Sequence, residues 1–260
     1  MNGRELKEAR LGAGWTQQQA AGKLGVTQAY LSMAERGYRV LPSSLARKAV
    51  EVLDAPPTAL PLREEGVVAL SDSDQLRAEL AALGYPGFAH VRGSHGRAAR
   101  VRRNPAEVLL NALTQADVDT RVVEGLPWLA YTYADLNWDW AVQNAKLHDL
   151  QNRLGFVTTV ASELGSSGLG SSGLDSSGLD SSRMGSSETS GAPNSEARTR
   201  KLREYAAVLE RSRLAKEDTL CHDSLTEVER KWLRANRPAE AAHWNLLTDM
   251  KAENLAHGRN

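Results

Sequence analysis

The residues best suited to chemistry are polar and small side chains that follow one glycine. Gly25 separates two helical segments, and the second opens on a threonine and a glutamine. A glutamine amide donates and accepts at once, so it can pair bidentately with adenine, and an alanine methyl can meet the thymine methyl. This pattern is suited to reading the edges of DNA bases. The residues predicted to face the bases are Thr27, Gln28, Ala29, Tyr30 and Ser32.

Other side chains near this segment are candidates to contact the DNA backbone. Lys23 comes before the glycine, and Arg36 and Arg39 follow the second segment. Cations bound to phosphates fix a protein's register on the duplex without reading its sequence. Gln17, at the start of the preceding segment, is placed to hydrogen-bond a phosphate and to brace Gln28.

Short helices must position these residues, and glycine and proline punctuation predicts where they lie. Thr16 and Gln19 form a capping-box pattern, Gly25 can take the positive φ that turns the chain, and Thr27 can cap the next helix. Leu31 then faces back toward the preceding helix, which gives two helices at a steep angle. The expected helices are Arg4–Leu11, Thr16–Leu24, Thr27–Glu35 and Ser43–Leu53.

These residues resemble the Cro/C1-type helix-turn-helix family, which includes lambda repressor and the xenobiotic-response-element (XRE) regulators of bacteria. The matching features cover about residues 3–55. They are Leu6 and Arg10, Trp15-Thr16-Gln17, Ala21, Gly25, the Thr27-Gln28 opening and Glu35-Arg36-Gly37. The resemblance implies a DNA-binding bundle in which Gln17 and Gln28 cooperate. A helical bundle that uses this fold only for protein contact is the alternative.

Composition limits the class of protein. The chain has 32 basic and 32 acidic residues, so DNA affinity must come from a local patch. A single cysteine, Cys221, indicates a reducing compartment. No apolar stretch approaches the roughly 18–20 residues that span a bilayer. We therefore expect a soluble, cytoplasmic protein without membrane contact.

Helical patterns continue through the rest of the chain. A helix is expected over Ser73–Leu83, short helices from Asn104-Pro105 to Leu126, and a longer one from Asp135 to about Leu164. Apolar spacing pairs the last of these with Arg198–Leu214 as an antiparallel hairpin. Between the two arms, residues 165–195 repeat glycine and serine in a pattern typical of a flexible insert.

A capping box at Ser224–Glu227 predicts a helix that carries Val228, Trp232 and Leu233. A further helix is expected to carry Ala242, Trp244 and Leu247. The sequence thus predicts an all-α protein with an N-terminal lambda-repressor-like bundle and a C-terminal helical domain. The predicted divisions are 1–62, a connector at 63–104, a helical domain formed by 105–164 and 196–260, and the insert at 165–195.

Weaker signals leave alternatives open. The arginines of residues 92–103 form either an arm on DNA or a solvated basic loop. The five later tryptophans form either a core or a partner or ligand surface. His148-Asp149, Cys221-His222-Asp223 and His243 match no catalytic or metal-binding motif. We therefore expect no enzymatic activity, no metal and no cofactor. The five tryptophans are Trp128, Trp138, Trp140, Trp232 and Trp244.

Together these patterns predict a sequence-specific transcriptional regulator, a homodimeric repressor that binds a palindromic double-stranded operator. The alternative is an antitoxin-like protein whose helical C-terminal region neutralises a partner toxin and whose DNA binding is autoregulatory. A cognate protein or a small-molecule effector is expected to bind the C-terminal region.

Overall fold

The computed structural model describes residues 1–63, 72–90, 103–166 and 195–255 of the 260-residue chain. Helices dominate these segments, and the strands are two residues long. The elements are α1 (Gly3–Gly12), α2 (Gln17–Leu24), α3 (Gln28–Glu35), α4 (Ser43–Val52), η1 (Pro57–Ala59), α5 (Ser73–Ala82), η2 (Pro86–Phe88), α7 (Pro105–Leu113), α8 (Thr120–Thr132), α9 (Trp138–Leu147), α10 (Gln151–Ser166), α11 (Ser195–Glu210), β1 (Asp218–Thr219), α12 (Glu227–Asn236), α13 (Ala239–His243), β2 (Leu246–Leu247) and η3 (Ala252–Asn254). The fold is therefore all-α in class.

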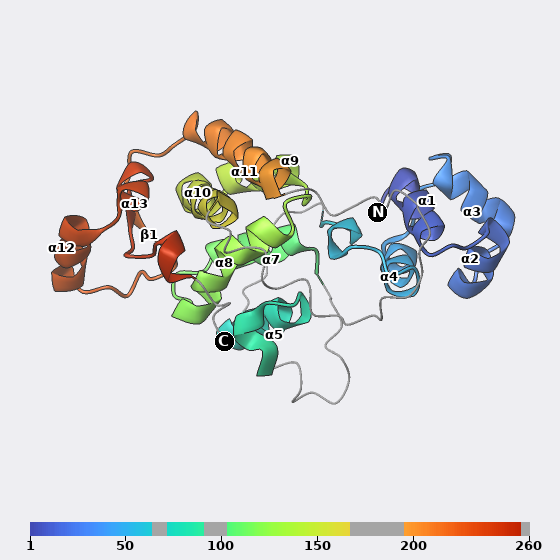
Figure 1. Ribbon diagram of the computed structural model, residues 1–260, viewed down its shortest axis with the longest axis horizontal. Coiled ribbons are helices and arrows are strands. Elements are labelled where there is room, and N and C mark those ends of the chain that lie inside the picture. The colour runs from blue at the N-terminus through green and yellow to red at the C-terminus, as the bar shows by residue number, and fades with distance from the viewer. Residues whose placement is uncertain (64–71, 91–102, 167–194, 256–260) are drawn as a thin grey trace.

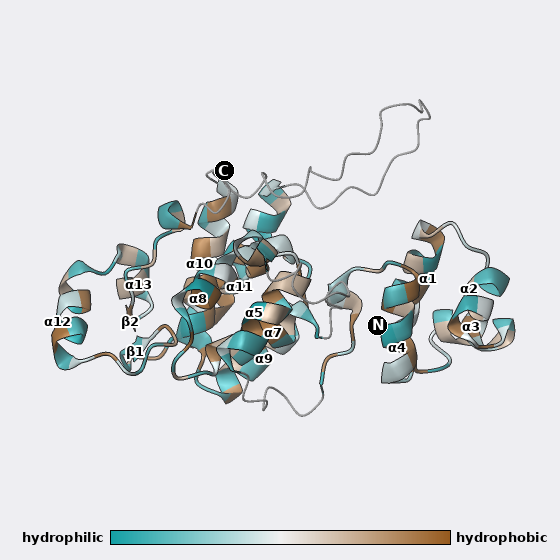
Figure 2. Ribbon diagram, turned by 90° about the horizontal axis from the view of Figure 1, so that it is seen from below, coloured by the Kyte–Doolittle hydropathy of each residue, from teal (hydrophilic) through white to brown (hydrophobic). Residues whose placement is uncertain are grey.

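Helices α1–α4 form an N-terminal bundle at one end of the molecule, and α5–α13 form a helical body (Figure 1). Within the body, α12 lies farthest from the bundle in both Figure 1 and Figure 2. The apolar side chains of the bundle make a cluster of their own, around Leu6, Leu24 and Leu31, separate from the larger cluster of the body. The division of the chain into domains at the predicted boundaries stays a prediction.

The body is built around α7 and a pair of antiparallel helices. Every residue of α7 is buried. At one end of the pair, Ser195 Oγ donates to Gly165 O (3.2 Å), and at the other end Asn152 bonds the backbone of Leu214. Helices α10 and α11 thus form the expected hairpin, with Leu154 and Leu202 buried between them and the rest of the body.

The long helix expected from Asp135 to Leu164 is wrong, because the chain turns between α9 and α10. Asp149 takes a φ of 56°, in the left-handed region where aspartate is tolerated and an α-helix cannot continue. Leu150 N closes this turn on Ala145 O (2.8 Å). The break leaves Leu147 71% exposed, although an unbroken helix with the expected apolar spacing would bury it against the partner arm of the hairpin.

Three other predicted boundaries are also corrected. Helix α8 does not stop at Leu126 but runs through Pro127, which is buried. The capping box of α12 joins Thr226 and Glu229, not Ser224 and Glu227, because Ser224 N donates instead to Asp117 Oδ1 (3.0 Å). Helix α13 ends before Trp244, and the following turn places Leu247 in β2, which pairs in parallel with β1.

The tryptophans divide between core and surface. Trp138 and Trp244 are 1% and 2% exposed, and Trp244 Nε1 donates to Thr159 Oγ1 (3.0 Å). Trp128 and Trp140 pack partly buried against the same core. Trp232, on α12, is 55% exposed. The core interpretation therefore holds for Trp138 and Trp244 and is wrong for Trp232.

Asn104 joins the N-terminal bundle to the body. Its Nδ2 donates to Thr58 O and Leu60 O (both 2.8 Å), and its Oδ1 accepts from Ala106 N (3.0 Å) as the N-cap of α7. Leu60 and Ala59 meanwhile pack with Val50 of α4. The segment after α4 is thus held by its side chains to the bundle and by its backbone to the body.

Some predictions lie outside the described residues. Of the basic stretch only Arg103 is described, and its Nε lies 3.2 Å from Glu79 Oε1. Of the predicted insert, Gly165 and Ser166 end α10 and Ser195 begins α11. Among the described helices, none has the length and apolar character needed to cross a membrane.

Candidate nucleic-acid interface

Local hydrogen bonds set the angle between α2 and α3. The Thr16 side chain accepts from Gln19 N and completes a capping box at the start of α2. Gly25 ends α2 with a φ of 77°, and Lys48 Nζ donates to Leu24 O (2.8 Å) at the same end. Thr27 Oγ1 then accepts from Tyr30 N (3.2 Å) and caps α3. The turn between the helices is therefore specified residue by residue.

A chain of four side chains runs from the interior of the bundle to the exposed start of α3. Arg10 Nε and Nη2 donate to the two carboxylate oxygens of Glu35 (2.6 and 3.1 Å). Gln17 Nε2 donates to Glu35 Oε2 (2.9 Å), and Gln28 Nε2 donates to Gln17 Oε1 (2.9 Å). The Arg10 and Glu35 side chains are only 9% and 2% exposed. The pair that holds the chain is therefore inside the bundle.

The chemistry of the carboxylate fixes the direction of this chain. Burial alone would raise the pKa of Glu35, but the hydrogen bonds from Arg10 and Gln17 outweigh it and lower that pKa. An ionised carboxylate only accepts, so Gln17 must turn its amide nitrogen inward and its oxygen outward. That oxygen in turn takes one N–H of Gln28. The other N–H and the Oε1 of Gln28 remain directed away from Gln17.

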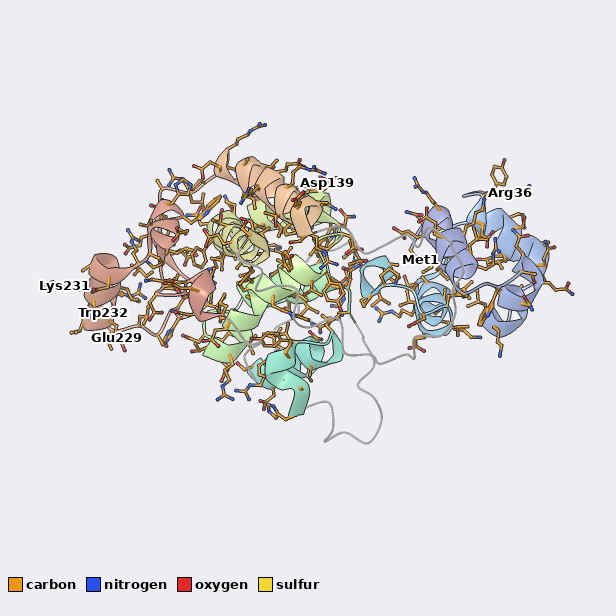
Figure 3. All side chains as sticks on the ribbon, viewed as in Figure 1. Met1, Arg36, Asp139, Glu229, Lys231 and Trp232 are labelled. Carbon is orange, nitrogen blue, oxygen red and sulfur yellow. The ribbon has the colours of Figure 1, made fainter. Side chains whose placement is uncertain are left out.

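The residues predicted to contact DNA lie together around α3. Gln28 and Ala29 are exposed, while Tyr30 and Ser32 are half-buried. Thr27 caps the helix that carries these residues. Lys23, Arg36 and Arg39 are also exposed; Figure 3 labels Arg36, at the end of the molecule away from α12. The bond between Gln28 Nε2 and Gln17 Oε1 (2.9 Å) links the start of α3 to the start of α2 at this surface.

Arg10 and Glu35 belong to the family pattern, but their role at the site was not predicted from the sequence. Their spacing of 25 residues hides the contact. A basic residue on the inner face of α1 and an acidic residue at the end of α3 were the available signal, since buried charges are paired. Both are positioning residues for Gln17.

Among the other titratable candidates, Cys221 and His243 each have a partner within the chain. Burial raises the pKa of the Cys221 thiol to about 12, and its Sγ donates to Ala112 O (3.3 Å). His243 Nε2 lies 2.7 Å from Glu210 Oε2 on the surface. Within the described segments, no group of three or more histidine, cysteine, aspartate or glutamate side chains has a metal-binding arrangement.

Comparison with known proteins identifies the N-terminal bundle alone. Residues 6–60 match the helix-turn-helix family of the XRE/Cro-C1 type. That family binds DNA and is not enzymatic. No curated protein and no solved structure matches the chain.

Proposed function

We propose that this chain, whose residues 6–60 are a Cro/C1-type helix-turn-helix DNA-binding domain, is a dimeric transcriptional repressor that reads its operator with α3. The recognition helix of such a domain enters the major groove with its N-terminal residues against the bases. In this proposal the helical body binds a second copy of the chain and also binds the molecule that regulates it. Each of these finer assignments extends the DNA-binding function of the domain.

The orientation of the Gln28 amide carries this proposal. Its bond to Gln17 leaves one N–H and the Oε1 of Gln28 for a partner. Adenine presents an N7 acceptor and an N6 donor in the major groove, which match those two groups. Since Arg10 and Glu35 hold Gln17 in place, the amide is oriented before DNA arrives and loses little side-chain entropy on binding.

Backbone contacts complete the proposed interface. Lys23, Arg36 and Arg39 are exposed around α3 and are proposed to neutralise phosphates. If all three do so, the logarithm of the binding constant falls with the logarithm of salt concentration with a slope near −0.9 for each phosphate. Replacing one of them by alanine should make that slope shallower by about one and weaken binding to all sequences alike.

Exposed apolar residues beside α3 support the dimer. Tyr38 and Val40, in the loop after α3, are 75% and 90% exposed. Two copies bound at half-sites one helical turn apart would bring such loops near each other on the DNA. A contact between these loops would bury both residues and fix the half-site spacing. A palindromic operator follows from the two-fold symmetry of such a dimer.

The test compares Gln28→Ala with Gln18→Ala after the preferred operator has been selected from random DNA with the full chain. Gln18 is exposed on α2 and outside the four-residue chain, so its variant is the matched control. Gln28→Ala should lose about 1–3 kcal/mol of discrimination at one base pair. Gln18→Ala should leave that preference unchanged. Equal operator preference in Gln28→Ala and the unaltered protein would refute the proposed placement of α3.

The antitoxin-like alternative is supported by α12 alone. On that helix Val228 is 79% exposed and Trp232 is 55% exposed. Tryptophan is frequent in the hot spots of protein interfaces. Purification from native cells separates the two functions. A stoichiometric protein partner released by Trp232→Ala supports the alternative, whereas a homodimer without partner supports the repressor.

A further inference from the structure

A cavity of about 480 Å³ lies in the helical body, away from the N-terminal bundle. Its walls come from the first half of α8, the turn that follows β1, α12 and the segment from β2 to η3. Small-molecule sites have volumes of roughly 300–1,000 Å³. Figure 3 labels Trp232 and Glu229 on α12, the helix that forms the outer wall.

The lining of the cavity defines a chemical class of ligand. The cavity is lined by apolar side chains such as Val123, Leu220 and Met250, and by Trp232 at its outer wall. The acidic residues Glu124, Glu229 and Asp249 line the same space together with His222, and none of the described residues that line it is a lysine or arginine. Hydrogen bonds from the Thr226 backbone and hydroxyl keep Glu229 ionised by lowering its pKa.

We propose that this cavity binds a small organic cation with an apolar body, such as an arylalkyl amine. The apolar walls would bury the body of the ligand, and its ammonium group would lie between the Trp232 ring and the carboxylates. An indole is the best of the aromatic rings for attracting a cation. An anion of the same size would meet three acidic residues against the single histidine His222, so a cation is the favoured ligand.

The cavity is connected to the N-terminal bundle through α7. Cys221, in the floor of the cavity, bonds Ala112 O in α7. Arg153 Nη1 donates to Leu113 O (2.9 Å) at the end of α7, and its Nε and Nη2 pair with Asp218 just before the floor. At the other end of α7, its N-cap Asn104 holds the segment that follows α4.

Because α7 is buried along its whole length, a shift of the Cys221 segment would act on packed neighbours, and the route that we propose runs along α7 to its N-cap. The ligand is therefore an effector that alters operator affinity. This regulatory part rests on the proposed function, whereas ligand binding itself does not require DNA.

The binding test uses the full chain with phenethylammonium, tryptamine and benzyltrimethylammonium as probes, and with 3-phenylpropanoate as the anion that shares the aryl body. Calorimetry and thermal unfolding report saturable binding, which raises the melting temperature by mass action. At least one cation should saturate at millimolar concentration or below, and the anion should not. If no cation saturates, or if the anion binds as well, the site is refuted.

Two variants on one helix locate the probe. Trp232→Ala should weaken cation binding roughly tenfold by removing the ring. Val228→Ala, one turn earlier and outside the cavity lining, should leave it unchanged. Asp249→Asn should weaken cations selectively, because it keeps shape and removes charge. Binding that is unchanged in Trp232→Ala would place the probe elsewhere and overturn the proposal.

The coupling test measures operator affinity with and without the bound cation. Asn104→Ser keeps a residue that can cap α7 but removes the amide that bonds Thr58 O and Leu60 O. The cation should change operator affinity in the unaltered protein and not in Asn104→Ser, while binding equally to both. Coupling that persists in Asn104→Ser refutes the route through α7. Absence of any operator binding refutes the proposed function and leaves the ligand result intact.

Discussion

Replacing Glu35 by glutamine should change which base the protein prefers without touching a DNA-contacting residue. Glutamine keeps the shape of Glu35 but offers one oxygen and one NH2 group. If the oxygen stays with Arg10, the NH2 group faces the NH2 of Gln17, whose amide must turn over. The amide of Gln28 must then turn as well, so that its donor and acceptor exchange places.

Two magnitudes follow from the structure. Breaking a buried ion pair costs about 3–5 kcal/mol, because one charge stays buried without its partner. Glutamine retains one of the bonds to Arg10, so we expect about 2–4 kcal/mol lower unfolding free energy of the N-terminal bundle. The exchanged amide no longer matches adenine, which should remove about 1–3 kcal/mol of discrimination at that base pair.

Leu6→Ala is the control, because Leu6 is fully buried in the same bundle and outside the side-chain chain. It should lose about 2–5 kcal/mol of stability and keep the base preference. Urea unfolding measures the first quantity, and competition among operators altered at one base pair measures the second. A Glu35→Gln protein that is destabilised yet keeps full adenine preference would show that the chain does not orient Gln28.

Gly155→Ala should destabilise the body by about 1–3 kcal/mol in urea unfolding, because its Cβ would lie 2.3 Å from the Trp244 ring. Gly22→Ala, with no neighbour within 4 Å of the new Cβ, should instead stabilise by about 0.5–1 kcal/mol, and equal effects would contradict the packing. Arg153→Met should cost about 3–5 kcal/mol by leaving Asp218 without its bidentate partner, and a loss below 1 kcal/mol would argue against that pair. Burial alone would raise the pKa of Asp218, but Arg153 outweighs it and holds that pKa below its usual 3.8. The stability from this carboxylate is therefore complete above about pH 3.8 and is lost as pH falls through the lower folded value, so the deficit of Asp218→Asn should shrink between pH 7 and pH 3.

The helix-turn-helix could be predicted because its signals are local. Thr16, Gly25 and Thr27 each act on neighbours within a few residues. In the structure Thr16 begins α2, Gly25 ends it and Thr27 begins α3. The role of Glu35 could not be derived in the same way. Its partners Arg10 and Gln17 belong to other helices, and only tertiary packing brings the three together.

The body was predicted less well for the same physical reason. Asp149 and Asn245 turn the chain at positive φ, and such residues occur inside helices and at their ends alike. Burial of the tryptophans also depends on distant partners. Trp244 is buried because Gly155 leaves room for its ring, whereas Trp232 lies on α12 with 55% of its surface exposed.

The complete burial of α7 has a consequence for hydrogen exchange. Its amides have no solvent-facing side from which a local fluctuation could expose them, so they should exchange only when the whole body opens. The amides of α2 and α3 lie in the small, separate cluster of the bundle and should exchange through opening of that cluster alone. Deuterium uptake should then be faster in α2 and α3 of the N-terminal bundle than in α7 of the helical body.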